Sequence, residues 1–118
     1  MLKSVERTGS SKADLKCFPE PVQDRMGFAI YQAQAGLRHR DAKPLKGLGS
    51  GVLKVMVRHD GDTFRAVYTV RFEIAVYVLH AFQKKVKRGV ATPKQELDLV
   101  RRRLRVAEQH YRNTHGGG

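Results

Sequence analysis

Disulfide bonds and membrane-spanning segments are excluded by what this sequence lacks. Its 118 residues include a single cysteine, which rules out an intrachain disulfide and favours a reducing, cytoplasmic setting. We interpret that residue, Cys17, as a small apolar side chain buried beside Phe18. No apolar run approaches the roughly 20 residues needed to cross a bilayer. The first residues also lack the apolar stretch of a secretory signal peptide, so we expect a cytoplasmic protein without a membrane partner.

Acidic residues are also scarce, and their scarcity is uneven along the chain. The sequence has 23 Lys and Arg against 11 Asp and Glu, a net charge of +12. Residues 1–42 hold seven basic and five acidic side chains, a net of +2, whereas residues 43–118 hold 16 and six, a net of +10. This asymmetry favours a polyanionic partner, either nucleic acid or an acidic protein surface. Solubility alone is the plainer alternative.

The first part of the chain carries the pattern of two helices joined by a short turn. A weak strand signal over residues 2–7 precedes Ser11 and Asp14, whose spacing resembles a capping box at a helix start. Pro21 suits the first turn of a second helix, which Gly36 ends. Apolar residues of this second segment repeat at helical spacing: Val22, Met26, Ile30, Ala33 and Leu37. We expect an αα-hairpin whose apolar side packs on a sheet.

Three strand patterns follow a polar loop over residues 38–51. That loop is rich in Gly and Pro but lacks phosphate-loop spacing, although Lys43 and Lys46 could contact a phosphate backbone. The strands are expected over residues 52–59, 63–72 and 75–83, as an antiparallel meander. Asp60-Gly61 predicts a tight hairpin turn between the first two, because both positions need a positive φ.

Alternation along the middle strand separates an apolar face from a basic one. Side chains of alternate residues point to opposite faces of a sheet. The apolar set, expected to pack against helices, is Phe64, Ala66, Tyr68, Val70 and Phe72. The opposite set, expected to be open to solvent or ligand, is Arg65, Val67, Thr69 and Arg71.

A last helix has the clearest start in the sequence. Thr92 is expected to cap it, Pro93 to take its first position, and Gln95 to close the capping box. An apolar stripe then docks the helix on the sheet: Leu97, Val100, Leu104, Ala107 and Tyr111. The prediction is therefore an α+β fold, a single domain over residues 1–113 with a flexible tail at 114–118.

This order of elements, with its basic sheet, resembles the RelE superfamily of bacterial toxins, and within it the HigB-type, phage-related branch. The resemblance covers nearly the whole chain. The segments that carry it are DLKCFPEPVQ at 14–23, AKPLKGLGSGVL at 42–53, DTFRAVYTVRF at 62–72, YVLHAFQKK at 77–85 and TPK at 92–94.

The resemblance implies a messenger-RNA endoribonuclease that needs no metal or other cofactor. Many members of the superfamily act on mRNA in the ribosomal A site and inhibit translation. A cognate antitoxin, usually a helix-turn-helix protein in this branch, holds them inactive, and operator DNA would be bound only through that antitoxin. Members tend to have an acidic residue where Lys54 stands and a serine where Val86 stands, so this chain departs from the pattern at two positions near the basic cluster.

Cleavage of RNA without a metal requires the 2′-OH to attack its own phosphate in line while charge and protons are managed by side chains. By the resemblance, Arg65 is the arginine of the R-A-V-Y run, and Lys84 and Lys85 belong to the Q-K-K run. We expect Arg65 to grip the scissile phosphate, with Lys84 or Lys85 assisting proton transfer or charge stabilisation. Flanking RNA backbone would be guided by a wider set of cations: Lys54, Arg58, Lys87, Arg88, Lys43 and Lys46.

Plainer readings remain open for several of these residues. Arg65 could form a salt bridge with Glu73 or Asp62, and the lysines could be a solvated strand end. We interpret His80 as a core histidine, with a catalytic role as the alternative. No spacing of His, Cys or acidic residues predicts a metal site. The rival functions are a non-catalytic module that binds RNA, DNA or an acidic partner, and a co-repressor with the toxin fold.

Overall fold

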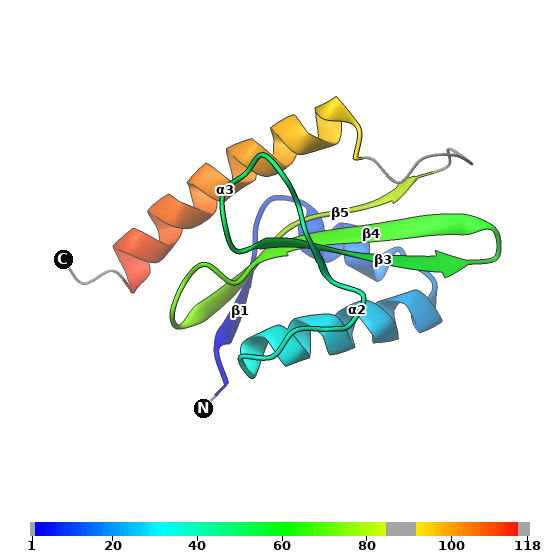
Figure 1. The fold of residues 1–118 in the computed structure, drawn as a ribbon, viewed down its shortest axis with the longest axis horizontal. Coiled ribbons are helices and arrows are strands. Elements are labelled where there is room, and N and C mark those ends of the chain that lie inside the picture. Colours follow the sequence, from blue (N-terminus) through cyan, green and yellow to red (C-terminus); the bar gives the residue numbers. More distant parts are fainter. Residues whose placement is uncertain (1, 85–91, 116–118) are drawn as a thin grey trace.

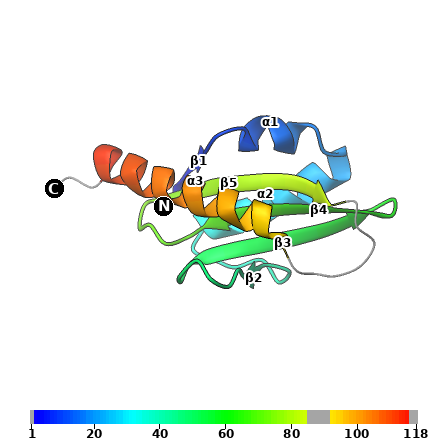
Figure 2. The ribbon, with the colours of Figure 1, turned by 90° about the horizontal axis from the view of Figure 1, so that it is seen from above.

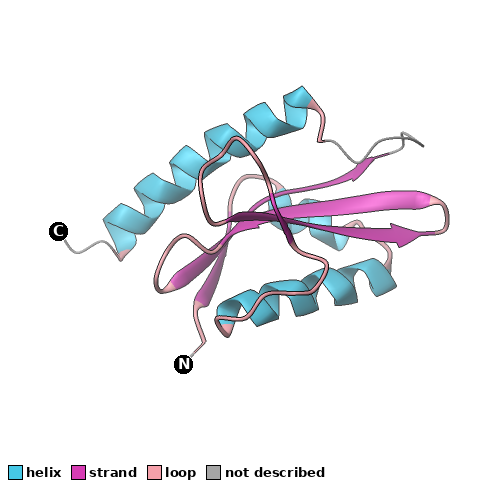
Figure 3. Cartoon of the chain, viewed as in Figure 1, coloured by secondary structure: helices cyan, strands magenta, loops and turns pink. Residues whose placement is uncertain are grey.

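The computed structural model describes residues 2–84 and 92–115, and all structural statements below concern these ranges. Figures 1 and 3 show a sheet that lies between one long helix and a helical hairpin. The elements in chain order are β1 (Ser4–Arg7), α1 (Ser11–Lys16), α2 (Glu20–Gln34), β2 (Lys43–Pro44), β3 (Val52–His59), β4 (Asp62–Thr69), β5 (Ala75–Lys84) and α3 (Lys94–Thr114).

The five strands form one mixed sheet in the order β1-β5-β4-β3-β2. Strands β3, β4 and β5 are the predicted antiparallel meander. The α+β class is therefore confirmed, but the sheet is not purely antiparallel, because β1 pairs with β5 in parallel. The two-residue strand β2 extends the sheet at its other edge, where Lys43 lies opposite Lys54. Sequence patterns did not predict β2.

One face of the sheet packs on α1 and α2, as expected. The apolar stripe of α2 is buried from Val22 to Ala33. It meets alternate residues of the three central strands, including Val55, Ala66 and Val76. The ring of Phe18 packs on that of Phe64, with 4.9 Å between centroids.

The opposite face, which we expected to be open, is largely covered by α3. Val100 and Leu104 of α3 pack on Val67 and Leu79 in a second core cluster. Figure 2 shows α3 lying over β5. Phe72, expected beside Phe64, belongs to this second cluster, because β4 ends before it and the register shifts after Val67. The prediction of an open face is therefore wrong at Arg65, Val67 and Thr69, which are buried.

The hairpin turn is confirmed. Asp60 has φ +49° and Gly61 φ +83°, the left-handed values that a tight turn between β3 and β4 requires. Because this turn fixes which residues of the two strands lie opposite one another, it also sets the register of the face described below.

Two helix starts differ from the predicted caps. Ser11 is the first residue of α1 and is fully buried, and its hydroxyl donates to the carbonyl of Val78 at 3.3 Å. Helix α3 begins at Lys94, after Pro93, and no side chain caps it. The Thr92 hydroxyl instead accepts a hydrogen bond from the Lys54 ammonium at 3.3 Å.

Two other expectations are corrected, and a third falls partly outside the described residues. Cys17 is exposed rather than buried, because it follows α1 at the surface. Leu37 is 62% exposed, since α2 ends before the stripe reaches it. Thr114, placed in the expected tail, is the last residue of α3, and residues 116–118 lie outside the described residues. The helices in the described ranges include none with the length and apolarity of a membrane span.

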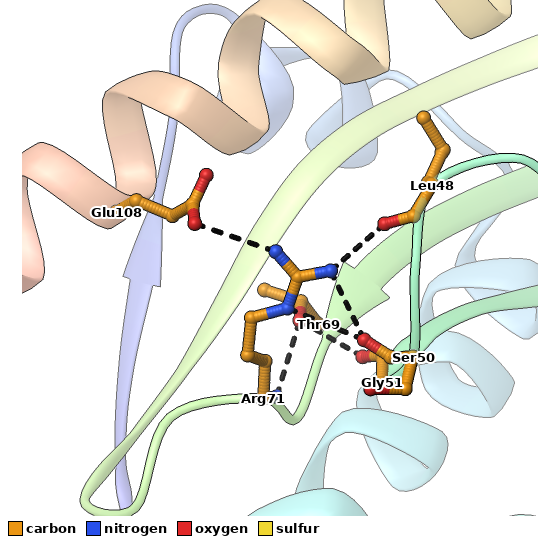
Figure 4. Close-up of polar contacts among 6 residues, drawn as sticks. All are labelled: Leu48, Ser50, Gly51, Thr69, Arg71 and Glu108. Atoms are coloured by element: carbon orange, nitrogen blue, oxygen red, sulfur yellow. Dashed lines mark hydrogen bonds and ion pairs between the residues drawn. The ribbon is translucent and has the colours of Figure 1, made fainter.

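Arg71, expected on the ligand face, ties the loop before β3 to the rest of the molecule (Figure 4). Its guanidinium donates to the carbonyl of Leu48 at 2.8 Å and to the carbonyl of Ser50 at 3.1 Å. A longer contact of 3.5 Å joins it to Glu108 of α3. Gly51 has φ +80°, and a Cβ there would meet the Arg71 backbone at 3.2 Å. The role of Arg71 is therefore structural.

Candidate functional site

Arg65 lies at the centre of the basic face of the sheet. In the register it stands directly opposite Met56 of β3 and Phe82 of β5. Residues two positions along each neighbouring strand share its face, with Cβ atoms about 7–8 Å away. Those four diagonal neighbours are Lys54, Arg58, His80 and Lys84.

The sheet register places Lys54 among other cations, and their charges affect its pKa. Burial lowers the pKa of the Lys54 ammonium, and the charges of Arg65, Lys84 and Lys43 lower it further, in that order. Lys43 enters the group because β2 places it opposite Lys54. Of the predicted site residues, the structure thus brings together Arg65, Lys84, Lys54 and Lys43, which we call the cationic cluster.

Arg65 differs from the other members because it lies below the surface. It is 1% exposed, and burial lowers the pKa of its guanidinium, although an arginine side chain stays charged in proteins. Lys54 and Lys84 are half-buried, and Lys43 is exposed. The cluster therefore has a buried charge at its base and ammonium groups nearer to solvent.

His80 belongs to a polar network between β5 and α3. Its Nε2 hydrogen-bonds to the Glu96 carboxylate, and its Nδ1 accepts from Arg103 at 3.3 Å, which fits the neutral tautomer with the proton on Nε2. The ring is 6% exposed and stacks on Phe82 at 4.7 Å. This agrees with a core histidine. Two hydrogen bonds therefore connect the start of α3 to the sheet beside the cationic cluster. One joins Glu96 to His80, and the other joins Thr92 to Lys54.

The remaining predicted residues are placed less centrally or not at all. Arg58 is exposed on the same face, and Lys46 is exposed in the loop after β2. Lys85, Val86, Lys87 and Arg88 lie outside the described residues. Tyr111, the last residue of the predicted apolar stripe of α3, stacks on Phe72 at 4.5 Å.

A groove beside the cluster was missed by the sequence reasoning. It has a volume of about 310 Å³ and is lined by Asp41, Lys43, Pro44, Lys54 and Met56. Only the pairing of β2 with β3 brings these residues together, and two residues of strand give no periodic signal. A larger cavity of about 570 Å³, between α2 and residues 38–41, is lined by none of the predicted site residues.

The described ranges contain no cluster of side chains suited to binding a metal ion. Residues 2–84 and 92–115 contain no group of three or more His, Cys, Asp and Glu side chains that could hold a metal ion. Arg65 and the charged lysines around it are donors that can bind and stabilise negative charge, and a lysine with a lowered pKa can also take part in proton transfer.

The chain is similar to a known protein family and to solved structures. A family model described as phage-derived protein Gp49-like matches residues 13–105. The free toxin RelE of Escherichia coli, solved as a double arginine-to-alanine mutant, superposes with a TM-score of 0.53 at 17% identity, over 69% of this chain and 82% of that chain. This likeness confirms the RelE-like fold.

A second solved structure is more distant. The RelBE2 toxin–antitoxin complex of Mycobacterium tuberculosis gives a TM-score of 0.44 at 20% identity, over 73% of this chain and 95% of that chain. Comparison with curated protein sequences gives no match. The family model matches most of the length of this chain, and the chain therefore belongs to the Gp49-like family of phage-derived proteins.

Proposed function

We propose that the protein is the toxin of a toxin–antitoxin system and acts as a metal-independent mRNA endoribonuclease. The fold supports this, because the superposed Escherichia coli protein is a toxin of the RelE type. The observation that carries the proposal is the cationic cluster, in which the sheet register sets Arg65 diagonally between Lys54 and Lys84, with Lys43 opposite Lys54. Burial, and then the charges of Arg65, Lys84 and Lys43, lower the pKa of Lys54. Perturbed ionisable groups gathered on one rigid face are typical of functional sites.

In the proposed reaction the 2′-oxygen attacks the adjacent phosphorus, the bond to the 5′-oxygen breaks, and a cyclic phosphate forms. Arg65, fixed beneath the phosphate, stabilises the added negative charge from a site of low dielectric. Lys84 and Lys85 bind the phosphate oxygens and protonate the leaving 5′-oxygen. Lys54 is the strongest candidate for accepting the 2′ proton, because a lowered pKa raises its neutral fraction at a given pH.

Partners follow from the same proposal. The substrate is mRNA, presented in the ribosomal A site, and the flanking backbone contacts Arg58, Lys43, Lys46, Lys87 and Arg88. A helix-turn-helix antitoxin neutralises the protein by covering basic surface, and operator DNA is reached through that antitoxin. A net charge of +12 suits an acidic antitoxin segment as well as RNA.

A second candidate is a binding module that has the same fold without cleavage. The observation in its favour is the burial of Arg65, whose guanidinium is 1% exposed and reaches a phosphate only where the phosphate enters the face deeply. Lys54 and Lys84 would then hold the RNA backbone without breaking it.

A translating extract separates the two candidates. We expect the unmodified chain to cut mRNA at mapped positions, and the double variant Arg65→Met with Lys84→Ala to cut at least about 100-fold less, because it loses charge stabilisation and proton transfer. Methionine keeps the length of the buried side chain. RNA bound but uncut by the unmodified chain would support the binding module.

The matched control is Arg102→Ala, which removes one positive charge from an exposed position of α3. Cutting should stay near the unmodified level. Thermal unfolding of all variants establishes that each is folded. Equal cleavage by the double variant and the control would remove Arg65 and Lys84 from the site.

A further inference from the structure

The groove beside the cationic cluster has the composition of a base-binding subsite. Lys54 belongs to both the cluster and the groove, so RNA backbone held at the cluster passes the mouth of the groove. Met56, which lines the groove, stands directly opposite Arg65 in the register. A base one step from the scissile phosphate is therefore within reach of it.

The size and walls of the groove suit one base splayed out of a single strand. Its volume of about 310 Å³ is at the lower end of small-molecule sites. Pro44 and Met56 provide apolar surface for the faces of a ring, and single-stranded RNA is recognised in proteins by such packing combined with hydrogen bonds to base edges.

The polar groups of the groove discriminate between bases. Asp41 lines the groove with a half-exposed side chain, whose Oδ2 lies 3.9 Å from His39 Nδ1. Its backbone N–H donates to the same His39 nitrogen at 3.0 Å. An ionised carboxylate only accepts hydrogen bonds. Guanine alone presents two adjacent donors on its Watson–Crick edge, N1–H and the N2 amino group, whereas adenine, cytosine and uracil each present an acceptor within that pair of positions. Lys43 also lines the groove, and its ammonium group can donate to guanine O6.

We propose that this groove binds a guanine base next to the cleaved linkage, with Asp41 accepting from N1–H and N2–H, and so sets the sequence preference of the protein. The inference rests on the proposed function for the identity of the substrate as RNA. The binding chemistry itself needs no cleavage, so it can be tested separately.

The test is a titration of the isotopically labelled full-length chain with guanosine, adenosine and inosine 5′-monophosphates, followed by NMR. Guanosine monophosphate should bind at least about tenfold more tightly than adenosine monophosphate, as expected for a two-point contact with a base edge. Inosine monophosphate, which lacks the N2 amino group, should bind with intermediate affinity. The largest shifts should fall on the backbone amides of Asp41, Lys43, Lys54 and Met56.

Asp41→Asn should abolish the preference for guanine, because an amide presents a donor as well as an acceptor. The matched control Asp24→Asn removes the same charge from an exposed residue of the other cavity and should leave the preference unchanged. Equal affinities for guanosine and adenosine monophosphates, a preference that survives Asp41→Asn, or shifts confined to other residues would overturn the proposal. A guanine preference without any mRNA cleavage in the extract would instead remove the proposed function and leave the subsite.

Discussion

The burial of the positive charge of Arg65 is unfavourable to folding. Burying a charged group costs free energy, and the charges of Lys54 and Lys84 on the same face add repulsion. A well-packed apolar side chain often fills such a site at no loss of stability. A cost of this kind at the centre of a basic surface favours a role in binding or catalysis over a role in folding.

Tyr68 offers a test of burial at the scale of one residue. Its side chain is fully buried, and its hydroxyl has no hydrogen-bond partner among residues 2–84 and 92–115. We expect Tyr68→Phe to leave stability at neutral pH unchanged or to raise it by up to about 1–3 kcal/mol, because an unsatisfied polar group is removed. Urea denaturation measures the difference. The contrasting variant Tyr77→Phe loses a hydrogen bond to His110 and should be destabilised by about 1 kcal/mol.

The same residue sets a pH dependence. Burial raises the pKa of Tyr68 from 10.0 to about 12, although the charge of Arg38 opposes the rise. Between these values the unfolded chain has lost the phenol proton and the folded chain keeps it, so stability falls as the pH rises. The advantage of Tyr68→Phe over the unmodified chain should therefore grow by up to about 1.4 kcal/mol per pH unit above pH 10. A difference that stays constant from pH 8 to pH 11 would contradict this placement of the hydroxyl.

At the scale of elements, the loop before β3 depends on one side chain. Arg71 donates to the carbonyls of Leu48 and Ser50, which otherwise have no strand partner to hold them in place. We expect Arg71→Met to lower the free energy of unfolding by about 1.5–3 kcal/mol, the range for hydrogen bonds to charged groups. The control Glu108→Gln breaks only the longer and more exposed ion pair, and should cost less than about 1 kcal/mol. Similar losses in both variants would show that the link to α3, and not the loop, carries the stability.

Elements with a strong local pattern were predictable from the sequence. The stripe of α2, the stripe of α3 and the Asp60-Gly61 turn each depend on neighbours a few residues apart, and the structure confirms all three except for Leu37, which lies beyond the end of α2. Element ends were less predictable. Ser11 and Thr92 have residue types that cap helices, yet both hydroxyls bond to distant groups, Val78 and Lys54, which no local pattern reveals.

At the scale of the whole molecule, the sequence predicted which side chains share a face but not what covers that face. Alternation placed Arg65 and Val67 together, and both are buried. Val67 is covered by α3, which begins more than 25 residues later in the chain. The parallel pairing of β1 with β5 joins distant parts of the chain, and the edge strand β2 is only two residues long, too short to leave a periodic signal. The groove at Asp41 depends on the pairing of β2 with β3, so the sequence did not predict it. The cations of the meander were predicted, because strand alternation alone places them on one face.

Analysis of the RNA ends produced when the protein cuts mRNA on purified, programmed ribosomes tests the central claim most directly. If the cationic cluster drives attack by the 2′-oxygen, the products carry a 5′-OH and a 2′,3′-cyclic phosphate or its opened form. The Arg65→Met with Lys84→Ala variant, purified in parallel, should yield neither end. Products with a 5′-phosphate and a 3′-OH would contradict the account.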